Sequence, residues 1–197
     1  MTKQTQSTPS RDGAEPDSLL IQEIAAGDRD AFEKLYRAYA PRLFRYLFSV
    51  TGDAGTSEEL TNDVMVAAWK GAPNFRGESR VSTWLFGIAH HKALNAVRGK
   101  QPLTVEIEQA SEAAAPDEGP QEIVLRHSLE QTVRSALQEL SPEHREVMEL
   151  TFYQGLSYPE IAEIMQCPVN TVKTRMFYAK KKLQEVLGRE GIAGETS

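Results

Sequence analysis

The sequence predicts an all-α protein in which two small helical domains are joined by a flexible acidic linker. Apolar residues recur at helical spacing up to residue 99 and again from residue 122. Residues 100–121 lie between these parts, lack any such period and are rich in Ala, Pro and acidic side chains. A length of 197 residues suits two small domains, and 40% hydrophobic residues allow each of them a modest packed interior.

The composition argues against several classes of protein. A single cysteine cannot form an internal disulfide, and no Cys/His cluster has metal-ligand spacing, so we expect no metal, no cofactor and a reducing cytoplasm. The apolar runs are far shorter than a membrane span, so no membrane insertion is expected. The sequence contains no phosphate loop and no nucleophile elbow, and we therefore predict that the protein is not an enzyme. The net charge of −6 still permits a local basic patch that binds nucleic acid.

The first predicted domain spans residues 19–99. Residues 1–18 before it are predicted to be a disordered tail, because they contain too few large apolar side chains to order themselves. Helical periodicity begins at Leu19 and breaks at Gly27. A second helix is expected from about Ala31 to Val50, with Asp28 or Asp30 as its cap and with Pro41 kinking or restarting it. Its inner side would carry Phe32, Leu35, Tyr36, Tyr39, Leu43, Leu47 and Val50.

A third helix is predicted from Ser57 to Lys70, after a loop at residues 51–56. Its inner stripe would be formed by Leu60, Val64, Ala67 and Ala68. The opposite face is acidic, with Glu59, Asn62, Asp63 and Val66 pointing outward. Such a face is either solvated or a docking surface for a basic partner, and the spacing alone does not choose.

The last helix of this domain follows a turn at Arg76-Gly77-Glu78, with Ser79 or Ser82 as its expected N-cap. Large apolar residues crowd into its first two turns, which is typical of a helix facing a protein interior. Cationic and amide side chains nevertheless alternate with the aromatics, as in surfaces that stack single-stranded bases. Both interpretations remain open from composition. The polar residues concerned are Arg76, Arg80, His90, His91, Lys92, Asn95 and Arg98.

The second predicted domain spans residues 122–187 and precedes a polar tail of residues 188–197. A helix is expected from Ile123 to about Leu140, and Ser141-Pro142-Glu143 is a strong start signal for the next one, which Gly155 ends. The stretch Leu156 to Leu183 then has the layout of a helix-turn-helix.

The helix-turn-helix is indicated by its start, its break and its second helix. Ser157 and Glu160 form a capping box, Gln166-Cys167-Pro168 breaks the chain, and a second helix begins at about Pro168. Between Gln166 and Leu187 there are five Lys or Arg and one acidic residue. We therefore expect this helix to enter the major groove of DNA, although a solvated basic face is the simpler alternative. Its buried stripe would be Val172, Met176, Ala179 and Leu183, and its outer face Asn170, Lys173, Thr174, Arg175, Lys180 and Lys181.

Taken together, these motifs resemble a known family. FRGES followed by TWL at residues 75–85, and LSYPEIAEIMQCPVNTVKTR at residues 156–175, resemble a bacterial RNA polymerase sigma factor of the extracytoplasmic-function group of the sigma-70 family. The resemblance covers about residues 19–187 and implies that the domain of residues 19–99 is the region-2 domain. The domain of residues 122–187 would be the region-4 domain, and residues 100–121 the linker between them.

The resemblance also implies partners and site residues. The helix around Asn62 would dock on the clamp helices of the largest subunit of core RNA polymerase. The final helix of the first domain would melt and recognise the minus-10 element, with a base flipped into a pocket near His91, and the helix-turn-helix would bind the minus-35 duplex. The docking residues would be Glu59, Leu60, Asn62, Asp63 and Met65. The minus-10 residues would be Phe75, Arg76, Ser79, Thr83, Trp84, His91, Lys92, Asn95 and Arg98. The minus-35 residues would be Asn170, Thr171, Lys173, Thr174, Arg175, Phe177, Tyr178 and Lys181.

The resemblance further implies control by a cognate anti-sigma factor, which would hold a cytoplasmic protein inactive and could retain it near the membrane. The competing hypothesis is a conventional helix-turn-helix regulator whose N-terminal helices sense a signal or form a dimer. The aromatic and basic segment from Phe75 to Arg98 discriminates between the two, because a sensor domain has no use for it. We expect Cys167 at the helix-turn-helix turn to be a small packing group rather than a redox sensor.

Overall fold

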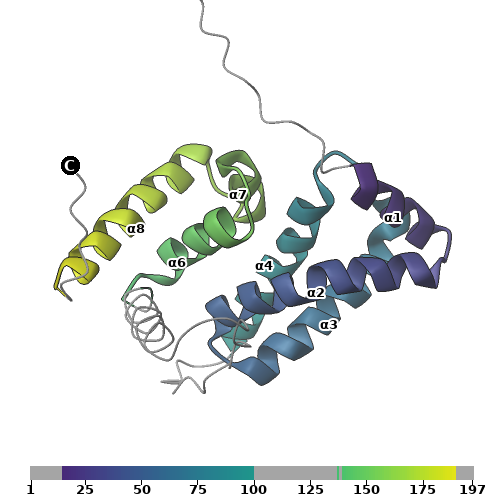
Figure 1. Cartoon of the computed structure of the whole chain (residues 1–197), viewed down its shortest axis with the longest axis horizontal. Helices are drawn as coiled ribbons and strands as arrows, with labels where there is room; N and C mark the ends of the chain where they lie inside the picture. Colours follow the sequence, from purple (N-terminus) through teal and green to yellow (C-terminus); the bar gives the residue numbers. More distant parts are fainter. Residues whose placement is uncertain (1–14, 100–136, 138, 190–197) are drawn as a thin grey trace, which may run out of the picture.

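The computed structural model describes residues 15–99, 137 and 139–189. In this part of the chain every regular element is helical, as the sequence predicts (Figure 1). The predicted linker and most of the helix expected from Ile123 to Leu140 lie outside the described residues. The elements in chain order are α1 (Glu15–Ala25), α2 (Arg29–Thr51), α3 (Ala54–Gly71), η1 (Ala72–Asn74), α4 (Val81–Gly99), α6 (Pro142–Met148), η2 (Glu149–Tyr153), α7 (Tyr158–Ile164) and α8 (Val169–Arg189).

The first domain is built around α2, which packs against α1, α3 and α4. Asp28 caps α2 by accepting hydrogen bonds from the backbone N–H groups of Asp30 and Ala31, and Gly52 ends the helix in a left-handed conformation. The helix runs through Pro41 without a restart, which corrects one of the two expectations for that residue.

Several predicted boundaries and faces of this domain were wrong. α1 begins at Glu15, four residues before the expected Leu19, and the Asp17 carboxylate accepts a hydrogen bond from the Tyr39 hydroxyl. α3 begins at Ala54 with Asp53 as its cap, so Ser57 is a buried residue and not the N-cap. Tyr36 is exposed, whereas Tyr46 is fully buried because it packs against Phe86 on α4 and against Glu146 on α6.

The second domain contains the predicted helix-turn-helix, formed by α7 and α8. Glu160 closes the capping box by accepting from the Ser157 backbone N–H at 2.8 Å, and Ser141 caps α6 as expected. α8 begins at Val169, directly after Pro168. In the turn between the two helices Gln166 adopts a φ of 49°, a left-handed conformation that non-glycine residues seldom adopt. Only a few residues separate α7 from α8, and this tight turn fixes the angle at which α8 leaves the domain.

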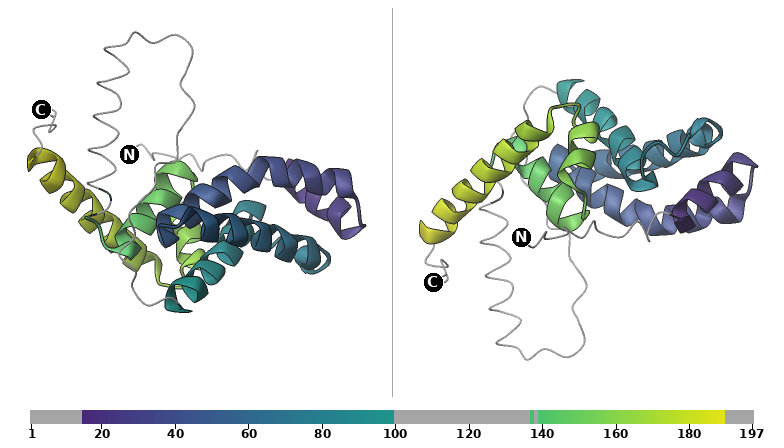
Figure 2. Two further views of the ribbon diagram at one scale, coloured as in Figure 1. Left: turned by 90° about the horizontal axis from the view of Figure 1, so that it is seen from below. Right: turned by 90° about the horizontal axis from the view of Figure 1, so that it is seen from above.

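The two domains pack against each other. α2 contacts α6 and α4 contacts α7, and buried residues from both domains form one continuous hydrophobic cluster. α1 and α8 therefore lie at opposite ends of the molecule, with α6 and α7 between α8 and the first domain (Figures 1 and 2). None of the helices in the described part of the chain has the length and hydropathy needed to cross a membrane. This arrangement decides which predicted site residues are accessible.

Candidate nucleic-acid interface

The outer face of α8 presents the residues expected to bind duplex DNA. Val172, Met176 and Ala179 are buried against the rest of the second domain, while Leu183 is half-buried. This stripe turns the opposite face of α8 to solvent. The predicted minus-35 residues on that outer face are exposed or half-buried: Asn170, Thr171, Lys173, Thr174, Arg175, Phe177, Tyr178 and Lys181.

Arg175 and Thr174 are held in place near the start of α8. Thr174 donates a hydrogen bond to the Asn170 carbonyl oxygen at 2.9 Å, and the Arg175 Nη1 atom lies 3.9 Å from the Cys167 sulfur. The pKa of the Glu143 carboxyl, at the start of α6, is lowered mainly by a hydrogen bond from the backbone N–H group of Glu143 itself. The nearby Arg175 guanidinium lowers this pKa further. The Arg175 side chain is thus held near the start of the helix-turn-helix, and the residue is half-buried.

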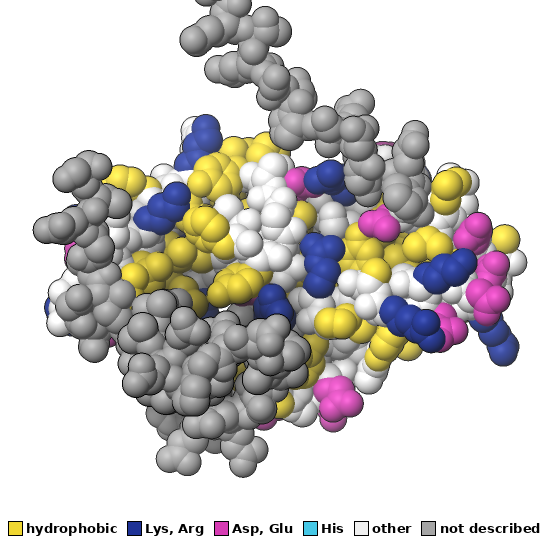
Figure 3. All heavy atoms as spheres, viewed as in Figure 1, with side chains coloured by type: hydrophobic (Ala, Val, Ile, Leu, Met, Phe, Trp, Pro, Cys, Tyr) yellow, Lys and Arg dark blue, Asp and Glu magenta, His cyan; other side chains and the backbone are white. Residues whose placement is uncertain are grey.

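Large aromatic side chains are exposed beside these cations. Phe177 is 64% exposed, and its ring packs against the Tyr178 ring with the centroids 5.4 Å apart. On η2 the exposed Phe152 ring lies under the Lys180 ammonium group at 5.6 Å. Figure 3 shows Lys and Arg side chains interspersed with hydrophobic ones over the part of the surface where α8 lies. The sequence did not single out Phe152, because at helical spacing it looks like an interior residue.

The predicted minus-10 residues lie along α4 and the turn before it. The Phe75 and Trp84 rings are 4.8 Å apart, and the Trp84 indole lies so close to Gly71 that a Cβ atom there would be only 3.1 Å from the ring. Lys92 pairs with the Asp63 carboxylate at 3.0 Å. Arg76, His91, Asn95 and Arg98 are exposed, and Ser79 is half-buried. The aromatic pair is therefore a half-buried platform in a segment that also exposes polar and cationic side chains.

Helix α7 covers part of this surface. The Thr83 side chain is only 2% exposed, and its hydroxyl donates to Glu160 Oε1 at 3.2 Å. The same oxygen lies 3.5 Å from Arg80 Nη1, and Gln166 Nε2 lies 3.1 Å from His91 Nε2. The pKa of Glu160 is lowered: partial burial opposes the shift, but hydrogen bonds from Ser157 and the nearby Arg80 outweigh it. An ionised carboxylate therefore lies among side chains predicted to bind nucleic acid.

The expected docking face of α3 needs one correction. Met65 is 1% exposed and belongs to the hydrophobic core, so it is not available to a partner. Glu59, Asn62 and Asp63 are exposed and Leu60 is half-buried. The Asn62 side-chain oxygen accepts a hydrogen bond from the Tyr36 hydroxyl at 3.0 Å.

An open hollow with a volume of about 490 Å³ lies beside this face, between α2 and α3. Its walls are mostly apolar, and Asn62 is the only predicted docking residue that lines it. The other lining residues were missed by sequence reasoning, because the expected helix put Tyr36 on the inner side of α2 and gave Pro41 a purely structural role. They are Tyr36, Arg37, Ala40, Pro41, Phe44, Glu58 and Thr61.

A buried polar cluster joins the two domains. Glu146, on α6, accepts a hydrogen bond from the Tyr46 hydroxyl, and Glu146 Oε1 lies 2.6 Å from His90 Nδ1. The Tyr46 hydroxyl also lies 3.3 Å from the same His90 nitrogen. Burial first, and then the Glu146 carboxylate, raise the pKa of Tyr46 well above its usual value, so the hydroxyl remains a donor. The sequence gives only a weak signal for the cluster, namely a Glu directly before the apolar Val147 and Met148.

The chemistry that these surfaces offer is suited to the recognition of nucleic acid. Among the described residues no group of three or more His, Cys, Asp or Glu side chains is arranged to hold a metal ion. What the surfaces offer is cations, amides and aromatic rings on α4 and α8. Cations pair with phosphates, side-chain amides pair with base edges, and rings stack on bases.

Comparison with known proteins identifies both domains. Residues 35–102 match the family model for Sigma-70 region 2, and residues 130–183 match the model for Sigma-70, region 4. The chain is 31% identical to the RNA polymerase sigma-H factor of Pseudomonas aeruginosa, over 88% of this chain and 94% of that one. It is 30% identical to the ECF RNA polymerase sigma-E factor of Escherichia coli K12, over 85% and 92% of the two chains. A solved structure of the sigma factor RpoE of Bartonella quintana with the anti-sigma factor NepR superposes with a TM-score of 0.63, at 25% identity and over 80% and 96% of the two chains.

Proposed function

The chain belongs to the extracytoplasmic-function group of the RNA polymerase sigma-70 factors, and we propose that it binds core RNA polymerase and directs it to start transcription at specific promoters. In this proposal residues 15–99 form the region-2 domain and the helix-turn-helix belongs to the region-4 domain. The protein supplies recognition in the cytoplasm, and the polymerase supplies the chemistry of RNA synthesis.

The region-4 domain binds the minus-35 duplex through α8. The support is the exposed face of α8, where amide, hydroxyl and cationic side chains stand opposite a buried apolar stripe. A helix of this kind fits the major groove, where Arg175 can pair with a base edge and Lys173 and Lys181 can neutralise phosphates. Phe177 and Tyr178 offer apolar contact to thymine methyl groups or to the sugar backbone.

The region-2 domain opens and recognises the minus-10 element through α4 and the turn before it. The single observation that carries this part is the Phe75–Trp84 platform, which is flanked by exposed polar and cationic residues. Bases that leave the duplex can stack on such rings, which contributes about 1–3 kcal/mol per base. His91 lies two turns further along α4, where one ring nitrogen can donate or accept a hydrogen bond with a flipped base.

Core polymerase docks on the α2 and α3 side of the region-2 domain. We extend the docking surface from Glu59, Leu60, Asn62 and Asp63 to the neighbouring hollow, because apolar walls with a polar rim are what protein interfaces provide. Tyr36, Pro41 and Phe44 would receive apolar side chains of the clamp helices. Glu58 and Glu59 at its edge would pair with basic residues of the same partner.

An anti-sigma factor controls the protein. The support is the similarity to the Bartonella quintana sigma factor, which was solved in complex with its anti-sigma factor, over 80% of the present chain. The shared fold over both domains supports a partner of the same kind for this chain.

The proposal is tested by reconstituting the purified chain with core polymerase. The expected result is run-off transcripts from a subset of genomic promoter fragments, which require the chain and begin at defined positions. Arg175→Ala is expected to reduce these transcripts, whereas Arg189→Ala, at the far end of the same helix, is expected to leave them unchanged. Duplex DNA binding by the chain without any polymerase-dependent initiation would instead identify a conventional helix-turn-helix regulator.

A further inference from the structure

The domain interface contains a polar cluster that is satisfied only when the domains are together. Tyr46 and His90 come from the region-2 domain and Glu146 comes from the region-4 domain. Glu146 is 6% exposed, and each of the three side chains has a partner within the cluster. A buried carboxylate is tolerated only when it is paired, so the cluster favours one alignment of the domains over displaced ones.

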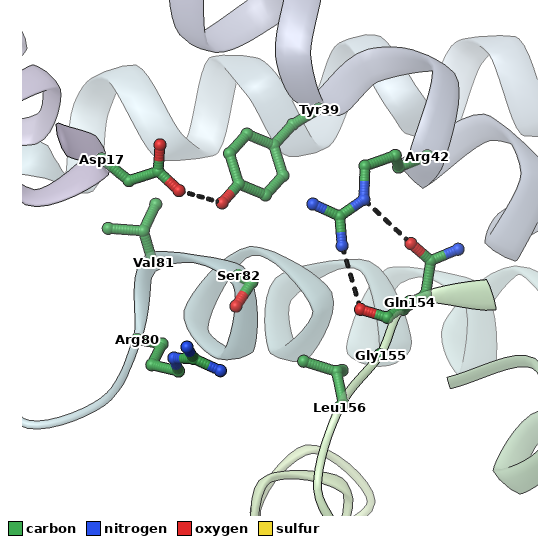
Figure 4. A pocket seen from close by; sticks show the side chains of 9 residues that line it. All are labelled: Asp17, Tyr39, Arg42, Arg80, Val81, Ser82, Gln154, Gly155 and Leu156. Carbon is green, nitrogen blue, oxygen red and sulfur yellow. Dashed lines mark hydrogen bonds between the residues drawn. The ribbon is translucent and has the colours of Figure 1, made fainter. Parts of the chain in front are cut away.

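A second set of contacts joins the domains beside this cluster. The Arg42 guanidinium group donates to the Gln154 side-chain oxygen and to its carbonyl oxygen, both at 3.1 Å (Figure 4). The same guanidinium lies over the Tyr39 and Phe86 rings at 5.1 and 5.7 Å. A guanidinium held by two rings and two acceptors has a fixed direction, so Gln154 is bound in one position.

The third set of contacts lies on the proposed minus-10 surface itself. Glu160 accepts from Thr83 and faces Arg80, and Gln166 contacts His91. These are groups that would contact nucleic acid, and their partners on α7 and in the following turn have the chemistry of nucleic acid. The Glu160 carboxylate faces Arg80 as a phosphate oxygen would. The Gln166 amide faces the His91 ring as a base edge would.

We propose that the region-4 domain is an intramolecular inhibitor of the region-2 domain, in which Glu160 and Gln166 occupy the minus-10 surface as mimics of DNA while the Tyr46–His90–Glu146 cluster holds the domains closed. This inference rests on the proposed function, because it assumes that α4 binds nucleic acid. The closed form and the minus-10 complex exclude each other, since Thr83 is accessible only after α7 moves away. A partner that draws α7 away from α4 would then release the minus-10 surface.

The closed state is measured first, in the absence of DNA and polymerase. Dyes are attached at Val97→Cys on α4 and Gln184→Cys on α8, two exposed positions, in a full-length chain that also carries Cys167→Ser. Energy transfer in this chain is expected to report one compact population. Glu146→Gln and Glu160→Gln are expected to add a population with lower energy transfer. Glu163→Gln is the control, because it makes the same change at an exposed position on α7 outside the interface.

The masking is measured next, with a labelled pool of single-stranded DNA of random sequence. Glu160→Gln retains a side chain that can serve the capping box, so the fold of α7 is preserved. We expect it to raise the affinity for the pool about fivefold, at constant salt, relative to Glu163→Gln. Glu146→Gln, which changes the buried cluster and leaves the Glu160 and Gln166 contacts themselves unaltered, is expected to raise the affinity in the same direction by opening the domains.

Each outcome decides the proposal. An unchanged energy-transfer distribution in both interface variants overturns the closed state, whatever the transcription assay gives. Opened domains without a gain in DNA affinity overturn the masking, and so does an equal gain in Glu163→Gln, which would be a general charge effect. Failure of the proposed function is recognised separately, as the absence of polymerase-dependent transcripts from a chain that still shows the opening.

Discussion

Buried charged residues are the individual positions where this structure departs most from expectation. Glu149 and Glu146 are both on the side of the second domain that faces α2, and both are nearly inaccessible. Burial raises the pKa of Glu149, and hydrogen bonding from Gln154 at 3.2 Å only partly opposes the shift. From the sequence alone both carboxylates would be expected in solvent, because their burial depends on packing between the two domains.

The Glu149 shift gives a prediction with a definite sign. A carboxyl whose pKa is raised in the folded state binds its proton more tightly there, so its contribution to stability is largest below its ordinary value of 4.5 and is lost as the pH rises through the raised value. Glu149→Gln replaces the titrating carboxyl with a neutral amide, so the variant does not lose this stability as the pH rises. The free energy of unfolding of the variant, minus that of the natural chain, should therefore grow as the pH rises from about 4.5 to about 7.5. Chemical denaturation at several pH values measures it, and a difference that is constant with pH would contradict the assignment.

Arg175 is the residue for which the proposed base contact is most specific. Arg175→Ala should cost about 1–3 kcal/mol in promoter binding and relax the preference at one base pair, if the guanidinium makes a bidentate pair with guanine. A simple phosphate contact would weaken all sequences alike and lower the salt slope by about one. Titration of minus-35 duplexes at several salt concentrations separates the two cases. Arg189→Ala is a matched control, because Arg189 pairs with Glu139 at the other end of α8.

At the scale of elements, the sequence was most informative where a helix has one clear apolar stripe and local start signals. Asp28, Ser141 and the Ser157–Glu160 box were all correct starts, because caps act through neighbouring residues only. The start of α3 and the burial of Met65 could not be predicted in the same way. Both depend on which other helices pack on α3, which is information that helical spacing does not contain.

The surface of α2 and α3 gives a prediction at this scale. Glu59→Lys reverses a charge on the exposed side of α3, and Asn62→Leu removes the partner of the Tyr36 hydroxyl at the rim of the hollow. Both are expected to weaken binding to core polymerase by about tenfold, as loss of a central interface contact does, while the helix content stays constant. Glu23→Lys is the control, because Glu23 is exposed on α1.

Affinity for the core polymerase is measured by titration with a labelled chain. Asp63 is a less suitable site for this test, because the Asp63 carboxylate pairs with Lys92 at 3.0 Å and its reversal would also disturb α4. Equal affinities for Glu59→Lys, Asn62→Leu and the control would remove the docking surface from this side of the molecule.

For the whole molecule, the sequence predicted two helical domains but not their mutual packing. The residues that join the domains are far apart in the chain, such as Arg42 and Gln154, and no local pattern marks them as partners. Three groups of contacts with different chemistry converge on one arrangement: a buried Tyr–His–Glu cluster, an arginine clamp and the Glu160 contacts with α4. In the proposed account the molecule carries two DNA-binding surfaces, and its domain packing covers one of them.

We propose that two surfaces of one chain recognise two separate promoter elements for the polymerase. The most direct measurement is selection of active promoters from a randomised library by the chain with core polymerase. We expect two enriched blocks at a fixed separation. Arg175→Ala should relax only the upstream block, and His91→Asn should change only the downstream block, because an amide offers two donors where a neutral imidazole offers one. A single enriched block, or a change in both blocks with either variant, would show that the two surfaces do not recognise separate promoter elements.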